Sequence, residues 1–230
     1  TLYQVPSMAM GVSDFTSSVP VLWWRSVGHS HTAFAMESLM DMVAAKAKRD
    51  PVDLRLSLLD QAEAKGQRMA NTIKAARDMA NWQMGDKRGF ASHFSFNTYA
   101  AVVADVSVDA KKVHVNKLYI AVDCGVAINP DVIKAQMEGG AGFALGAIAR
   151  NEITLDKGQV VEANFPQYEP TRLMDMPDIE VKIVTSNEAP TGVGEPAVPP
   201  TGPAIANAIF ALTGVRITDL PMTKAGFNFV

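Results

Sequence analysis

Apolar side chains in the first part of the chain recur at helical spacing. Between residues 30 and 48 they fall near one face, which predicts a helix. They are Phe34, Leu39, Met40, Val43 and Ala47. A second helix is predicted from Pro51, because Asp50 is a favourable N-cap and proline is well tolerated at the first helical position. A third, more polar helix is predicted from about residue 67 to residue 82, followed by a basic turn over residues 85–89.

The middle of the chain changes to a β pattern. Residues 98–108 and 113–123 are rich in Val, Ala, Ile and Tyr and predict two paired strands joined by a short turn. A hairpin is predicted over residues 151–164, on either side of an Asp-Lys-Gly turn. Alternating apolar and polar residues over 179–185 predict one more strand.

Two further helices are predicted in the second half of the chain. One starts at Asn129-Pro130-Asp131 and runs through Phe143. It contains four glycine residues, which are unfavourable in a helix and indicate close packing against a neighbour or a cofactor. They are Gly139, Gly140, Gly142 and Gly146. The other helix follows Thr201 and stops at Gly214, and its apolar face is formed by Ile205, Ile209 and Leu212.

The order of these elements predicts the fold class. With 230 residues the chain is long enough to bury a core, as one large or two small domains. After a lead-in strand or loop over residues 1–19, helices come first, and strands with crossing helices follow. This order predicts an α+β fold with a helical lobe followed by a mixed sheet with crossing helices. We place a mainly helical lobe at residues 1–89 and an α/β lobe at residues 90–230.

Composition and charge exclude several classes of protein. The net charge is −3 and no run of Lys and Arg occurs, so nucleic acid is not an expected partner. Apolar stretches are too short for a membrane span. The single cysteine, Cys124, excludes an internal disulfide and an iron–sulfur cluster held by this chain. The chain starts with Thr and has no signal peptide, so we expect a processed or truncated segment, and both cytoplasm and periplasm stay open as compartments.

One carboxylate stands alone in a stiff loop that precedes the last helix. Glu195 lies between Gly194 and Pro196, and the loop contains no other charged side chain. Glycine permits close approach of a ligand, and proline restricts movement. Such surroundings can adjust a carboxylate for proton transfer. The alternative interpretation is a connector rich in Pro and Gly whose glutamate is solvated.

Three blocks of sequence, taken in order, resemble one enzyme family. They read PVLWWRSVGHSHTAFAMES from Pro20, AVDCGVAINPDVIKAQMEGGAGFALG from Ala121 and TGVGEPAVPPTGPAIANAIF from Thr191. Together they resemble the C-terminal molybdenum-site part of the xanthine dehydrogenase/aldehyde oxidase family. The nearest variety is the large (beta) subunit of the isoquinoline 1-oxidoreductase type, which shares the Trp-Trp-Arg-Ser-Val-Gly form. The resemblance extends from about residue 20 to residue 220.

The resemblance implies a function and a cofactor. In this family a glutamate on the matching loop is the general base of a molybdenum hydroxylase that uses water as its oxygen source, and Glu195 occupies that position. The implied substrate is a small molecule, either an N-heteroaromatic compound or an aldehyde. The implied cofactor is molybdenum-molybdopterin in its cytosine dinucleotide form, and no protein side chain is expected to bind the metal directly.

The resemblance also assigns residues to cofactor binding. Gln136 lies in the Gln-x-Glu-Gly segment and resembles a pterin or metal-site contact, the alternative being a solvated helix residue. Arg25 matches the arginine of the Arg-x-x-Gly loop near the pterin, the alternative being a surface salt bridge. Gly28, which closes this loop, and Gly194 complete the predicted cofactor-binding set.

Some residues depart from the family pattern or lack a partner. Val27 stands where relatives that act on purines have an aromatic residue, which disfavours a purine and leaves Trp23 and Trp24 as candidate ring contacts. His29 and His31 lie two residues apart, but no Cys or His completes a metal site, so a structural role is expected. His93 and His114 are isolated and are interpreted as ordinary surface or strand residues.

The chain lacks parts of the cofactor cradle of the family. A Gly-Gly-Phe-Gly loop and a Met-Gly-Gln-Gly stretch do not occur in it. The expected partners are therefore the N-terminal part of the same large subunit and a small iron–sulfur subunit that accepts electrons, and the segment is expected to be inactive alone. Two alternatives remain: a non-catalytic assembly module of such a complex, and a free-standing binder of a small ligand. An intact GVGEP loop favours the catalytic interpretation.

Overall fold

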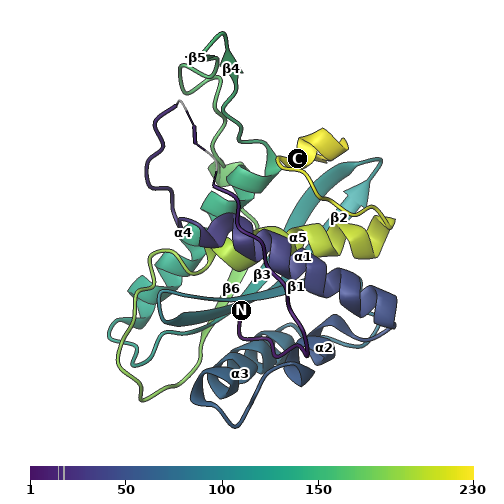
Figure 1. The fold of residues 1–230 in the computed structure, drawn as a ribbon, viewed down its shortest axis with the longest axis vertical. Coiled ribbons are helices and arrows are strands. Elements are labelled where there is room, and N and C mark those ends of the chain that lie inside the picture. Colours follow the sequence, from purple (N-terminus) through teal and green to yellow (C-terminus); the bar gives the residue numbers. More distant parts are fainter. Residues whose placement is uncertain (15, 18) are drawn as a thin grey trace.

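The computed structural model describes residues 1–14, 16, 17 and 19–230, and its centre is a mixed five-stranded sheet (Figure 1). The strand order is β1-β2-β3-β6, and β7 also pairs with β3. The strands are β1 (Gly89–Ser95), β2 (Thr98–Asp109), β3 (Lys112–Asp123), β6 (Asp178–Ile183) and β7 (Asn228–Phe229). β1, β2 and β3 are antiparallel neighbours, whereas β6 and β7 run parallel to β3. The predicted α+β fold class with a mixed sheet is confirmed.

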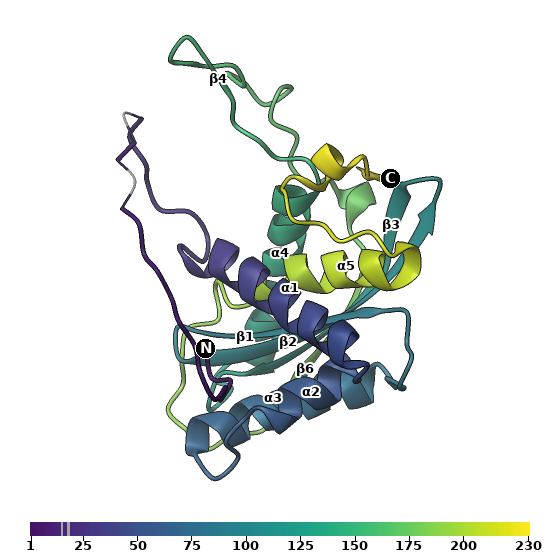
Figure 2. The same ribbon diagram turned by 45° about the vertical axis from the view of Figure 1, so that its right-hand side comes forward.

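Helices cover both faces of this sheet (Figure 2). α2 and α3 lie on one face, α4 and α5 pack on the other, and α1 lies along α5. The helices are α1 (His29–Ala47), α2 (Pro51–Ser57), α3 (Ala64–Met79), α4 (Pro130–Ala149) and α5 (Val198–Thr213), with short 3-10 helices η1 (Leu173–Asp175) and η2 (Met222–Ala225). A small hairpin of β4 (Leu155–Asp156) and β5 (Gln159–Val160) projects from the body of the molecule.

β2 is buried on both faces, which explains its nearly continuous apolar sequence. Successive strand residues point to opposite faces of a sheet. Val102 and Ala104 join the core formed with α4 and α5, whereas Ala101 and Val103 join the core formed with α3. The sheet therefore has a hydrophobic core on each side.

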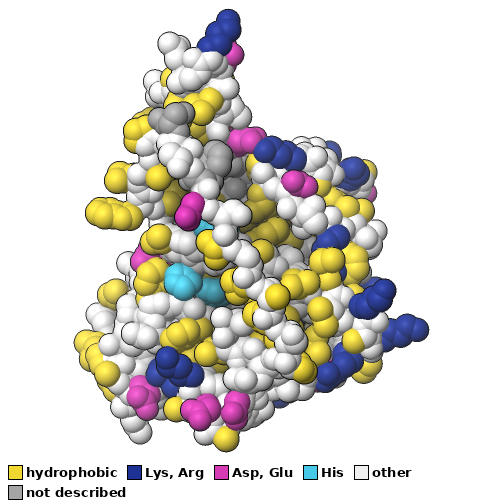
Figure 3. Space-filling view, in the orientation of Figure 1, with side chains coloured by type: hydrophobic (Ala, Val, Ile, Leu, Met, Phe, Trp, Pro, Cys, Tyr) yellow, Lys and Arg dark blue, Asp and Glu magenta, His cyan; other side chains and the backbone are white. Residues whose placement is uncertain are grey.

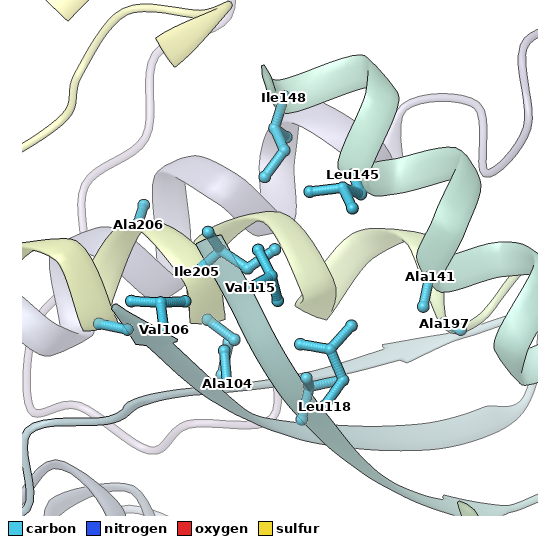
Figure 4. Packing of buried hydrophobic residues seen from close by; sticks show 14 of the residues in the cluster. Ala104, Val106, Val115, Leu118, Ala141, Leu145, Ile148, Ala197, Ile205 and Ala206 are labelled. Carbon is cyan, nitrogen blue, oxygen red and sulfur yellow. The ribbon is translucent and has the colours of Figure 1, made fainter. Parts of the chain in front are cut away.

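The core between the sheet and α5 fixes the position of that helix (Figure 4). Ile205 of α5 faces Val115 and Leu118 of the sheet, and Leu145 and Ile148 of α4 close the side of the cluster. Burying an aliphatic side chain of this kind stabilises a protein by about 1.5–3 kcal/mol. Because several such side chains hold α5, the loop that enters its first turn is held as well.

α1 buries only part of the face that was predicted. Phe34 and Met40 are buried as expected, but Leu39 is 51% exposed, Val43 is 43% exposed, and Ala47 is exposed as well. The buried face continues instead through Glu37, whose carboxylate forms an ion pair of 2.8 Å with Arg55, and both side chains are fully excluded from solvent. Spacing of apolar residues alone cannot reveal a buried ion pair, so the prediction for Leu39 and Val43 was wrong.

β1 was not predicted. Residues 85–89 were expected to be a basic turn, and the first predicted strand of the sheet began at residue 98. The observed strand begins at Gly89 and pairs with β2 from Gly89 to Ser95. Its sequence mixes Ser and His with apolar residues and lacks a clear alternation. The pairing with β2, which is a contact between segments, determines this strand.

Most other elements agree with the sequence. The strands over residues 98–123 and 178–183 are confirmed, and the hairpin exists with two-residue strands. Asp50 caps α2, since its side chain accepts hydrogen bonds from the amides of Val52 and Asp53. α5 was predicted to follow Thr201, but it starts four residues earlier, at Val198. It stops at Gly214, which has the left-handed conformation, and Leu212 is 42% exposed.

The first residues form little regular structure. An isolated bridge joins Tyr3 to Leu59. The lead-in predicted over residues 1–19 includes Phe15 and Ser18, which lie outside the described residues. The division of the chain into a helical lobe and an α/β lobe, with a boundary between residues 89 and 90, stays a prediction. Among the residues that the structure describes, none belongs to a helix with the length and apolar character needed to cross a membrane.

Candidate functional site

Glu195 lies at the end of a loop that hydrogen bonds attach to the sheet. The loop connects β6 to α5. The hydroxyl of Thr98 donates to the carbonyl of Gly192 at 2.7 Å, and the amide of Thr191 donates to the carbonyl of Cys124 at 2.9 Å. Buried proline residues follow Glu195 directly and restrict the backbone. The loop is thus attached at residues 191 and 192 and restricted by proline where it enters α5.

Arg25 joins this loop to α4. Its Nε donates to the carbonyl of Gly194 at 2.8 Å, and one terminal nitrogen donates to the side-chain oxygen of Gln136 at 3.2 Å and to its carbonyl at 3.4 Å. These partners are neutral oxygen atoms rather than a carboxylate. Partial burial lowers the pKa of the Arg25 guanidinium from its ordinary value, and the nearby Glu195 carboxylate acts in the opposite direction. Arg25 therefore braces two distant segments against each other.

Ser26 makes the direct contacts with Glu195. Its backbone amide donates to Oε1 of Glu195 at 2.7 Å, and its hydroxyl donates to the Glu195 carbonyl, also at 2.7 Å. Ser26 is completely buried, and its φ of 76° lies in the left-handed region. A role for Ser26 was not predicted from the sequence. Its position beside Arg25 was the only available signal, because a positive φ at a serine leaves no mark in the sequence.

One oxygen of the Glu195 carboxylate is held and the other is free. Oε1 accepts the hydrogen bond from Ser26. Within residues 1–14, 16, 17 and 19–230, no hydrogen bond reaches Oε2. A carboxylate with a fixed orientation and one free oxygen is suited to accept a proton from a neighbouring molecule.

Gln136 presents a free amide nitrogen on the second turn of α4. Its side-chain oxygen accepts from Arg25, while in the described part of the chain no hydrogen bond involves its nitrogen. A Cβ added at Gly140 would lie 3.0 Å from the Cβ of Ala197, so α4 and the start of α5 approach closely here. The predicted close packing of the α4 glycines is confirmed at this position.

Gly28 lies outside the hydrogen-bonded cluster. It precedes α1 with an ordinary φ of −67°, and its carbonyl accepts a hydrogen bond of 2.7 Å from the hydroxyl of Thr32. The structure thus brings together Arg25, Gln136, Gly194 and Glu195, and leaves Gly28 at the first turn of the neighbouring helix. The assignment of these five residues to catalysis or cofactor binding stays a prediction.

Aromatic side chains flank the cluster on one side. The rings of Trp24 and Phe143 lie 4.7 Å apart between their centroids, and the Arg25 guanidinium lies 5.8 Å from the Phe143 centroid. Trp23 is 87% exposed, and Val27 is 51% exposed. A ring contact between Trp23 or Trp24 and a substrate stays a prediction.

An apolar cavity lies next to the cluster. Its volume is about 270 Å³, and its walls include Trp24, Phe34, Tyr168 and Pro199. Neither Glu195 nor Gln136 lines it. The cavity is therefore a neighbour of the cluster and not its centre.

His29, the first residue of α1, forms a pair with His93, which lies far from it in the sequence. Nδ1 of His29 and Nε2 of His93 lie 2.9 Å apart, and the ring of His29 also packs against Phe96. Burial, with a contribution from His29, lowers the pKa of His93 to about 4. Histidine side chains are visible among hydrophobic ones on this face (Figure 3). The interpretation of His93 as isolated was wrong, because the partner is 64 positions away.

A metal site made of protein side chains is absent from the part of the chain that the structure describes. In the ranges 1–14, 16, 17 and 19–230, no three or more His, Cys, Asp or Glu residues gather in a way that could hold a metal ion. The expectation that the protein supplies no metal ligand stays a prediction.

Comparison with known proteins identifies the family. A family model described as a molybdopterin cofactor-binding domain matches residues 31–177, a region that includes Gln136 and ends before Glu195. The chain is 32% identical over 232 residues to the isoquinoline 1-oxidoreductase subunit beta of Brevundimonas diminuta, across 97% of this chain and 29% of that protein. It is 34% identical over 224 residues to a Gluconacetobacter polyoxogenes protein named membrane-bound aldehyde dehydrogenase (pyrroloquinoline-quinone), across 88% of this chain and 29% of that protein.

A solved structure adds to these similarities. Quinoline 2-oxidoreductase from Pseudomonas putida 86 matches with a TM-score of 0.51 and 26% identity, over 54% of this chain and 17% of that chain. The chain thus spans less than a third of the length of these relatives. Because the family model covers more than half of the chain, and the similarity to the beta subunit covers nearly all of it, the chain belongs to the molybdopterin cofactor-binding domain family of the molybdenum hydroxylases related to xanthine dehydrogenase.

Proposed function

We propose that this chain is the C-terminal part of a molybdenum hydroxylase large subunit, in which Glu195 is the general base. The enzyme would oxidise an N-heteroaromatic compound or an aldehyde with water as the oxygen source. The observation that carries the proposal is the Glu195 carboxylate itself, which Ser26 holds at one oxygen, while the other oxygen accepts no hydrogen bond from the residues that the structure describes. A general base needs this combination of fixed position and free lone pair.

The residues around Glu195 fit a molybdopterin cofactor. Such a group is rich in hydrogen-bonding oxygen and nitrogen atoms, and the Gln136 amide nitrogen is available as a donor. Gly194 and Gly139 expose their backbone, and a Cβ at either position would meet no atom closer than 3.9 Å. Gln136, Arg25, Gly28 and Gly194 would hold the group, in its cytosine dinucleotide form, together with segments that this chain does not contain. When bound, the cofactor supplies the redox centre of the reaction.

The chain's own residues then have separate tasks. The free oxygen of Glu195 accepts the proton of the oxygen nucleophile. Arg25 keeps the Gly194 carbonyl and the Gln136 side chain in place. Trp24 and Phe143, which pack against each other, give an apolar edge against which an aromatic substrate can lie.

The substrate class rests on the relatives and on Val27. The relatives carry the names of an isoquinoline, an aldehyde and a quinoline enzyme, which supports an N-heteroaromatic or aldehyde substrate for this chain. Val27 does not offer the aromatic ring that a purine substrate would stack on. We therefore propose a substrate that is not a purine.

The proposed partners are the N-terminal part of the same subunit and a small iron–sulfur subunit. The chain spans less than a third of its curated relatives, and apolar side chains on α1 are exposed, including Leu39, Met42 and Val43. Exposed apolar patches mark interaction surfaces. The same exposure supports a second candidate, a non-catalytic assembly module, which the Glu195 variant tests.

The proposal is tested with the complete large subunit and its partner subunit. Oxidation of isoquinoline, quinoline and an aromatic aldehyde is measured for the parent, for Glu195→Gln and for Glu188→Gln. Glu188 lies on the same loop. Its backbone carbonyl accepts a hydrogen bond from the amide of Val126, and a change of side chain preserves this bond. We expect activity toward at least one of these compounds, loss of that activity in Glu195→Gln, and retention in Glu188→Gln. Full activity of a molybdenum-loaded Glu195→Gln enzyme would favour the assembly module.

A further inference from the structure

Ser26 contacts both the side chain and the main chain of Glu195. The Ser26 amide binds the carboxylate and the Ser26 hydroxyl binds the main-chain carbonyl, each at 2.7 Å. The same carbonyl accepts a second hydrogen bond from the amide of Val198 at 3.0 Å. A carbonyl oxygen has two lone pairs, so this oxygen is saturated. The main chain and the side chain of Glu195 are therefore fixed by one partner residue.

The turn that carries Ser26 is built to present its amide. Ser26 and Val27 have φ values of 76° and 48°, a conformation that is unfavourable for residues with a Cβ atom. It persists because the surrounding contacts determine it: Val27 donates its amide to the Trp24 carbonyl at 2.8 Å, and the Ser30 hydroxyl donates to the Arg25 carbonyl at 3.0 Å. Backbone strain of this kind gathers at functional sites.

The turn is also anchored on a rigid part of the molecule. It leads directly into α1, and α1 packs along α5, the helix that Glu195 precedes. Ser26 and Glu195 therefore lie just before the N-termini of two helices that pack against each other. Movement of α1 relative to α5 would break both hydrogen bonds at once.

We infer that Ser26 is a positioning residue for Glu195, on the proposed function that Glu195 is the general base. The amide holds one carboxylate oxygen and thereby sets the orientation of the other, and the hydroxyl holds the main chain from which the side chain extends. A base held in this way needs no reorganisation before it accepts a proton. Ser26 itself takes no part in the chemistry.

The experiment uses the complete enzyme and two variants, one in the turn and one in the first turn of α1. Ser26→Ala removes the hydroxyl and keeps the amide. Thr32→Ala is the matched control, since its hydroxyl donates to Gly28 in the same segment and has no contact with Glu195. Because one hydrogen bond is lost, we expect kcat of Ser26→Ala to fall about tenfold, with KM and molybdenum content close to the parent. Thr32→Ala should keep the parent kcat.

A double-mutant cycle separates positioning from a general structural role. If Ser26 acts through Glu195, Ser26→Ala should lower kcat in the parent and have no further effect in the Glu195→Gln enzyme. An equal further loss in that background would overturn the inference. Near-normal turnover of Glu195→Gln alone is a different outcome, which would overturn the proposed function on which the inference rests.

A measurement without turnover completes the test. Hydrogen–deuterium exchange of the peptide that covers residues 192–197 should be faster in Ser26→Ala than in Thr32→Ala, since the loop loses one of its attachments. If Ser26→Ala fails to fold or to load molybdenum, Ser26→Gly replaces it, because glycine tolerates the positive φ and retains the amide. Parent kcat and parent exchange in a molybdenum-loaded variant without the hydroxyl would overturn the inference.

Discussion

Nε of Arg25 lies 2.8 Å from the carbonyl oxygen of Gly194, the residue immediately before Glu195. The same guanidinium reaches the side chain of Gln136 on α4. The two segments that Arg25 joins are separated from it by 169 and 111 positions. A planar group with several donors in a fixed arrangement is suited to bridge them.

Arg25→Lys should lower turnover although it preserves the positive charge. A lysine ammonium cannot reproduce the guanidinium geometry toward Gly194 and Gln136, so we expect kcat of the complete enzyme to fall about tenfold, the effect of losing one to two hydrogen bonds. The matched control is Arg77→Lys on α3, where the arginine pairs with Asp78 at the surface. Parent kcat in a folded Arg25→Lys enzyme would show that the brace is not needed.

Glu195→Gln should lower kcat by at least about 10²-fold, the lower end for losing a general base. Glutamine keeps the size and polarity of the side chain but does not accept a proton near neutral pH. Molybdenum content should stay at the parent level, and KM should change much less than kcat, because the lost interaction belongs to the transition state. Steady-state kinetics beside metal analysis measure this, with Glu188→Gln as control. A molybdenum-loaded variant with a rate near the parent would show that Glu195 is not the base.

The 230-residue chain expressed alone should fold without retaining molybdenum. Two buried cores support folding, and the Gly-Gly-Phe-Gly and Met-Gly-Gln-Gly segments that complete the cradle in the family are not part of it. Circular dichroism tests the first half of this prediction and metal analysis tests the second. Stoichiometric molybdenum with bound pterin in the purified chain would contradict it.

The isolated chain should self-associate through the exposed side of α1. Leu39, Met42 and Val43 are each about half exposed, and apolar surface of this kind favours association. The double variant Leu39→Glu/Val43→Lys should reduce association in a light-scattering concentration series, and its new charges lie four residues apart on the helix and attract each other. Leu173→Lys, at a 92% exposed position elsewhere, is the control. A parent chain that stays monomeric over a wide concentration range would argue against this surface.

The stability of the chain should decrease in mild acid because of His93. Burial lowers the pKa of His93 from 6.5 to about 4, so below pH 6.5 the unfolded chain binds a proton that the folded chain excludes. The neutral histidine therefore stabilises the fold fully above pH 6.5, and this stabilisation, at most about 3 kcal/mol, is lost as the pH falls toward 4.

Urea unfolding at several pH values tests this. His93→Gln should show a smaller loss of stability between pH 6.5 and 4 than the parent, whereas His114→Gln, at an exposed position, should behave like the parent. Identical pH dependence of the parent and His93→Gln would mean that other groups are responsible.

Local signals in the sequence predicted the parts of the fold that depend on local interactions. Asp50 and Asn129 cap helices as expected, because an N-cap acts on amides only two or three residues away. β2 and β3 were predicted because they are rich in Val, Ala, Ile and Tyr, which the stretches of both strands that are buried on both faces require. β1 was not predicted because its mixed composition gives no clear strand pattern. Its strand conformation depends on pairing with β2, which is an interaction with another segment of the chain.

The same distinction applies to the candidate site. Glu195, Gln136 and Arg25 were selected through motifs, and the structure brings their side chains into one cluster. The role of Ser26 depends on a left-handed backbone and on a partner 169 positions away, and the pair of His29 and His93 depends on the approach of α1 to β1. Neither relationship leaves a pattern in the order of residues.

The cluster also has a consequence for the order of events during synthesis. Its members come from the segment before α1, from α4 and from the loop before α5, so most of the chain must be made before they can meet. Contacts between such distant positions form late in folding, because closing long loops costs entropy. While a ribosome is still extending the chain toward residue 195, Arg25 lacks its partner Gly194 and Ser26 lacks its partner Glu195. A cofactor that depends on the complete cluster can therefore be bound only after residue 195 has been made and has reached Ser26.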